Sequence, residues 1–118
     1  MFGSAVVAQL SAAGHETALI PSLEQLPPGA FEVLVIDLTA EAPARLRALE
    51  RADIGTPRTI GVYAHVEVDV RRAAERAGLD LVVPRSRFAR EGAELVTRLS
   101  RRSGDRTSPP RQAGDGPA

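Results

Sequence analysis

The feature that most constrains this chain is the segment of residues 31–38, FEVLVIDL, in which Val33, Leu34, Val35 and Ile36 are consecutive and apolar. An uninterrupted apolar run of this kind is typical of a strand buried on both faces, as in a parallel sheet covered by helices. Aromatic residues make up only 3% of the sequence, so a core must consist mainly of Val, Leu, Ile and Ala. The run therefore predicts an α/β protein.

Strand and helix patterns alternate along the rest of the chain. Strands are predicted at residues 16–20, 31–38, 59–63 and 81–83, and helices at residues 4–13, 42–52, 68–77 and 88–99, with a helical turn in residues 22–26. Gly14 and Gly78 are expected to end helices, because glycine favours the left-handed conformation found there. The short links predict βαβ units and a parallel sheet of about four strands. We expect one domain over residues 1–100 and a disordered tail over residues 101–118, which lacks large apolar residues.

Composition excludes several functions. The 15 basic residues, all Arg, balance 15 acidic ones, so no net charge favours binding to nucleic acid or to a membrane surface. There is no Cys, and no apolar stretch reaches the roughly 18 residues of a membrane span. No signal peptide is evident, so we expect a cytoplasmic protein. Because glycine-rich phosphate loops, nucleophile elbows and zinc-ligand patterns are also missing, we expect neither an enzyme nor a metal site.

Asp37 follows the most apolar strand. Sites in open parallel sheets lie at the carboxyl ends of strands, where a ligand can reach a side chain of this kind. Asp37 is therefore a candidate phosphoacceptor, metal ligand or anchor for a partner. The alternative is a structural carboxylate that caps the following loop through Thr39.

The ends of the next two predicted strands carry further candidates. Tyr63, Ala64 and His65 follow one strand, and His65 is a candidate base, ligand or pH-sensitive contact, or simply a loop residue. Arg85 follows the other strand and is a candidate partner for Asp37 or for an anion, while Ser86 is a candidate helix cap. The alternative for this second group is a solvated basic loop.

The pattern resembles the receiver domain of bacterial response regulators of two-component systems, over residues 1 to about 100. The resemblance rests on the sequence GHE at residues 14–16, on VLVIDL ending near Asp37, on TIGVYAH at residues 59–65, on AAERAGLDLVV at residues 73–83, and on the basic loop after them. It implies a flavodoxin-like, three-layer fold and a role in signal transduction.

The resemblance also implies which residues carry the family's function. Asp37 matches the phosphoacceptor, Tyr63 and Ala64 stand where the family has its switch hydroxyl, and Arg85 stands in place of the family's lysine. The first strand, with the acidic pair that holds Mg²⁺, is missing before the first predicted helix. A single carboxylate is a poor Mg²⁺ site. We therefore expect a degenerate receiver that works without phosphorylation and without a cofactor, Mg²⁺ entering only if an acidic pair lies upstream.

These observations leave alternative functions open. The first is a phosphorylation-independent module that binds a protein partner, by analogy through residues 81–99. The second is a phosphorylatable receiver whose true start lies upstream of Met1. The third is a flavodoxin-like domain that binds a small molecule.

Overall fold

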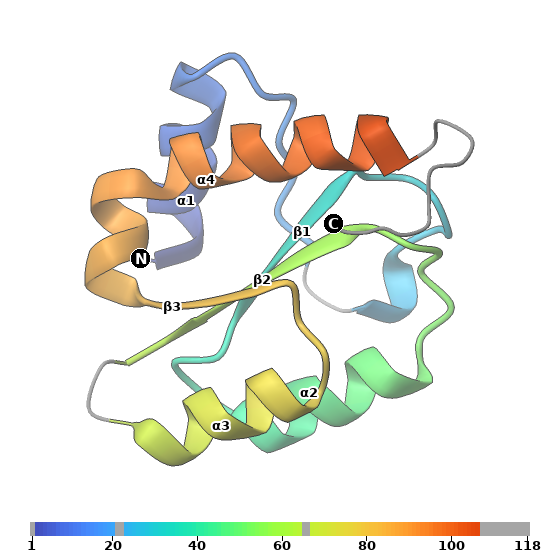
Figure 1. The fold of residues 1–118 in the computed structure, drawn as a ribbon, viewed down its shortest axis with the longest axis vertical. Coiled ribbons are helices and arrows are strands. Elements are labelled where there is room, and N and C mark those ends of the chain that lie inside the picture. Colours follow the sequence, from blue (N-terminus) through green and yellow to red (C-terminus); the bar gives the residue numbers. More distant parts are fainter. Residues whose placement is uncertain (1, 21–22, 65–66, 107–118) are drawn as a thin grey trace.

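The computed structural model describes residues 2–20, 23–64 and 67–106. The helices are α1 (Phe2–Ala12), α2 (Ala42–Arg51), α3 (Val68–Arg76) and α4 (Arg85–Arg106), with a short 3₁₀ helix, η1 (Leu23–Gln25). The strands are β1 (Val33–Asp37), β2 (Arg58–Tyr63) and β3 (Leu81–Pro84). Figure 1 shows the sheet between two helical layers, with α1 and α4 on one side and α2 and α3 on the other.

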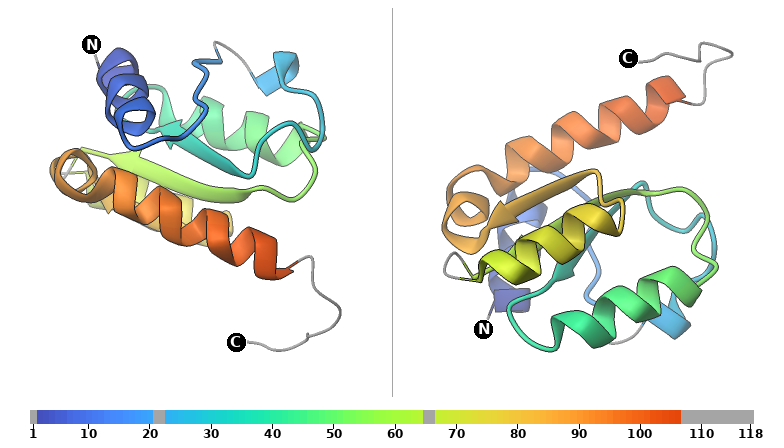
Figure 2. Two further views of the ribbon diagram at one scale, coloured as in Figure 1. Left: turned by 90° about the horizontal axis from the view of Figure 1, so that it is seen from above. Right: turned by 60° about the horizontal axis from the view of Figure 1, so that its bottom comes forward.

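The sheet is parallel, and its strands lie in the order β1-β2-β3. Val35 of β1 lies beside Ile60 of β2, and Ile60 lies beside Leu81 of β3. The crossover helices α2 and α3 cover the same face of the sheet (Figure 2), as expected when successive βαβ connections have the same handedness. The predicted α/β architecture with a parallel sheet is confirmed, and its layout is compatible with the flavodoxin-like arrangement.

The core lies on both faces of the sheet, because successive strand residues point to opposite faces. Val62 and Val83 face α1 and α4, where they pack with Phe88, and all three side chains are 0% exposed. On the other face, Ile36 and Tyr63 pack with Ala74 of α3. This two-sided burial accounts for the uninterrupted apolar run in β1 and confirms the interpretation of that segment.

The prediction of a strand at residues 16–20 is wrong. This segment has no regular structure, and Leu19 is 64% exposed. A strand requires a neighbouring strand to pair with its backbone, and the sheet in the described part of the chain has three strands rather than about four. Residues 16–20 do not pair with β1, because β1 pairs with β2 alone among the described strands.

The last helix is longer than predicted. It begins at Arg85 and ends at Arg106, so it passes the domain boundary expected at residue 100. Once a helix is nucleated by packing, each further residue adds a backbone hydrogen bond, so polar residues such as Arg102 continue it. Ser86 lies within its first turn and is not the cap that precedes it. The rest of the predicted tail, residues 107–118, lies outside the described residues.

Candidate functional site at the carboxyl end of β1

Asp37 is the last residue of β1, and its carboxylate turns back onto the following loop. Its Oδ1 atom accepts a hydrogen bond from the backbone N–H of Thr39, at 2.9 Å, and another from the Thr39 hydroxyl, at 2.5 Å. Aspartate commonly closes a turn in this way by bonding to a residue two positions further on. The loop-capping alternative therefore describes the observed contacts of this oxygen.

The basic partner of Asp37 is Arg45 of α2. Its Nη1 atom donates to the Asp37 backbone carbonyl at 2.7 Å and lies 3.9 Å from the carboxylate Oδ2. Glu41, with a φ of 55°, turns the chain immediately before α2 and so directs the helix back along the sheet. Arg45 thus neutralises part of the charge at this strand end.

The predicted pairing of Arg85 with Asp37 is not what the structure shows. β2 separates β1 from β3, and Asp37 lies beside Val62 while Pro84, the residue before Arg85, lies beside Tyr63. Among the described residues, Arg85 makes no ion pair, and it is exposed at the start of α4. The structure therefore brings Asp37 together with Thr39 and Arg45.

Tyr63 and Ala64 lie at the end of β2, but Tyr63 does not present its side chain as a free switch. It is 7% exposed and packs in the core beneath α2 and α3. The Ala64 carbonyl accepts a hydrogen bond from the backbone of Glu67, which leads into α3. His65 lies outside the described residues.

The side chains around Asp37 determine whether this strand end could hold a metal ion. Within residues 2–20, 23–64 and 67–106, no group of three or more His, Asp or Glu side chains is placed to hold a metal ion. Oxygen-rich sites for Mg²⁺ normally use one or two carboxylates with further oxygen ligands. The described polar side-chain neighbours of the Asp37 carboxylate are a hydroxyl and a guanidinium, and a guanidinium cannot ligate a cation.

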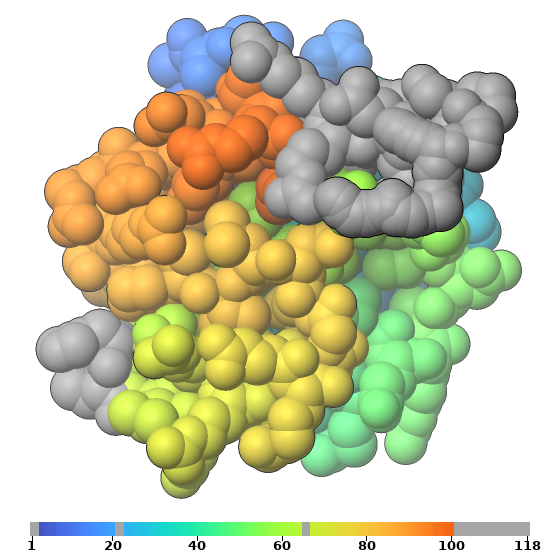
Figure 3. Space-filling view, in the orientation of Figure 1, coloured from blue at the N-terminus to red at the C-terminus, as the bar shows by residue number. Residues whose placement is uncertain are grey.

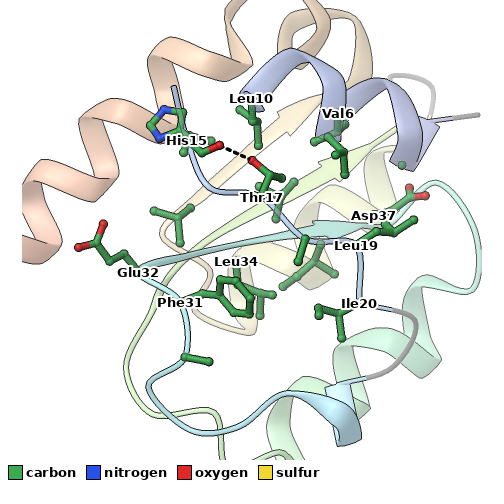
Figure 4. Close-up of a pocket in the computed structure, with 18 of the residues that line it drawn as sticks. Val6, Leu10, His15, Thr17, Leu19, Ile20, Phe31, Glu32, Leu34 and Asp37 are labelled. Carbon is green, nitrogen blue, oxygen red and sulfur yellow. Dashed lines mark hydrogen bonds between the residues drawn. The ribbon is translucent and has the colours of Figure 1, made fainter. Parts of the chain in front are cut away.

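A groove of about 920 Å³ runs along the outer edge of β1. We call it the β1 groove. β1 forms its floor, Val6 and Leu10 of α1 and Ala48 of α2 contribute to its sides, and residues 17–20 form the opposite wall. Figure 4 shows Glu32 at the amino end of β1, Asp37 at the carboxyl end, and Leu19 across from the strand.

Neither Arg45 nor the β1 groove was evident from the sequence. Arg45 is one of several basic residues in its helix, and only the turn at Glu41 brings it to Asp37. In the described part of the chain, residues 17–20 and β1 both line the groove without forming a backbone hydrogen bond to each other. No signal in the sequence shows that residues 16–20, which carry strand-forming side chains, do not pair with β1.

Comparison of the chain with protein-family models, with curated proteins and with solved structures gives no match. In the part of the chain that the structure describes, no helix is both long enough and apolar enough to cross a membrane.

Proposed function

We propose that this chain is a receiver-like signalling module that binds a protein partner and does not depend on phosphorylation of Asp37. The observation that carries the proposal is the engagement of the Asp37 carboxylate by Thr39 and Arg45. A phosphoacceptor must present a carboxylate oxygen to the incoming phosphoryl group, with a cation that neutralises the charge developing on that group. Here Oδ1 already accepts two hydrogen bonds, and the nearby cation is Arg45.

The fold supports the signalling part of the proposal. Asp37 lies at the carboxyl end of a parallel strand, where open α/β sheets generally place their sites. The resemblance to receiver domains supplies the function class, because a fold alone does not define an activity. In the described part of the chain, the polar side chains beside the Asp37 carboxylate are those of Thr39 and Arg45.

The partner surface first expected was residues 81–99. In the space-filling view of Figure 3, α4 (orange) lies above α3 (yellow-green to yellow) on the face turned to the viewer. The large apolar side chains of α4, among them Phe88 and Leu95, are buried in the core, and its outer face carries ion pairs such as that between Arg87 and Glu91. Exposed ion pairs contribute little to affinity. The outer edge of β1 pairs with no strand in the described part of the chain, and it is the stronger candidate because it offers both hydrogen-bonding groups and apolar contact.

The proposal is tested by incubation with acetyl phosphate and Mg²⁺, followed by intact-protein mass spectrometry. A phosphorylatable receiver domain in the same reaction confirms that the reagent is active. We expect no phosphoryl adduct on this chain. A Mg²⁺-dependent adduct that hydroxylamine removes, and that is absent from an Asp37→Asn variant, would overturn the proposal.

A further inference from the structure

We draw no further inference here: the strongest candidate, the β1 groove between the outer edge of β1 and residues 17–20, carries none because nothing in the described part of the chain shows what covers it.

Discussion

The carboxylate of Asp37 and the N–H and hydroxyl of Thr39 close the turn that follows β1 through two hydrogen bonds to one oxygen atom. This turn leads the chain toward α2, from which Arg45 returns to the same aspartate. The stability of the strand end therefore depends on one carboxylate, and this dependence can be measured.

Replacing Asp37 by alanine should lower the free energy of unfolding by about 1–2 kcal/mol, because both Thr39 donors lose their acceptor. Asp37→Asn retains an acceptor oxygen and should cost less than about 1 kcal/mol. Urea denaturation followed by circular dichroism measures both. Asp53→Ala, at an exposed aspartate, is the control and should stay within about 0.5 kcal/mol of the wild type. Equal stability of the wild type and Asp37→Ala would show that the turn does not need this carboxylate.

His15 and Thr97 should show a coupling of about 0.5–1.5 kcal/mol in a double-mutant cycle. His15 Nε2 lies 2.9 Å from the Thr97 hydroxyl, which joins the loop after α1 to the middle of α4. The cycle compares His15→Ala, Thr97→Val and the double variant by urea denaturation. Additive effects of the two substitutions would contradict a direct bond.

The bond between His15 and Thr97 also predicts which ring nitrogen of His15 carries the proton. The Thr97 hydroxyl donates to the Ala93 carbonyl at 2.9 Å, so it must accept from His15. We therefore expect the tautomer with its proton on Nε2, which long-range ¹H–¹⁵N NMR spectra of the imidazole distinguish. A spectrum with the proton on Nδ1 would reverse the assignment of donor and acceptor.

Gly92→Ala should destabilise the protein by about 1–3 kcal/mol, although alanine usually stabilises a helix. A Cβ atom at residue 92 would lie 2.7 Å from the ring of Phe88, which is fully buried and cannot move aside. Gly3→Ala in α1 is the matched control. Its Cβ would meet the end of the exposed, flexible Leu19 side chain at 3.0 Å, so we expect little loss. Thermal denaturation compares the two, and a partial recovery in Phe88→Leu/Gly92→Ala would identify the ring as the cause.

Asp80→Ala should cost about 1.5–3 kcal/mol. Its carboxylate accepts from the N–H of Thr59 at 2.8 Å and from Arg58 at 3.2 Å, and so ties the start of β2 to the loop before β3. Arg58 is only partly exposed and would lose its ion-pair partner. Glu75→Ala breaks the exposed pair with Arg71 and should change stability by less than about 0.5 kcal/mol. Equal losses for the two variants would contradict the special role of Asp80.

Local signals predicted most of the fold. β1 is recognisable in the sequence as an apolar run because both of its faces are buried. Gly14 and Gly78, expected to end helices, have φ angles of +94° and +87°, which glycine adopts without strain. The predicted bounds of α2 and α3 agree with the structure to within a residue or two, because the ends of a helix depend on residues close by in the sequence.

Long-range relationships account for what the sequence did not reveal. Residues 16–20 carry strand-forming side chains, but a strand also needs a neighbour, and pairing depends on residues far along the chain. Arg45 reaches Asp37 only because the backbone at Glu41 adopts a left-handed conformation, which is uncommon for glutamate. Arg85 was a candidate partner for Asp37 or for an anion because both residues follow strands of the same sheet, and the position of β2 between their strands separates them. The role of Asp37 itself stays a proposal.

The pairing of α1 with α4 has a consequence for folding during synthesis. Both helices are needed to cover one face of the sheet, and Gln9 of α1 bonds to the Phe88 carbonyl at the start of α4. β1, α2, β2, α3 and β3 follow one another along the chain and leave the ribosome before α4. Until α4 emerges, α1 has no helix beside it and the face bearing Val62 is uncovered. We therefore expect a truncated chain that ends at β3 to bind a holdase chaperone, and the chain that includes α4 to bind it less.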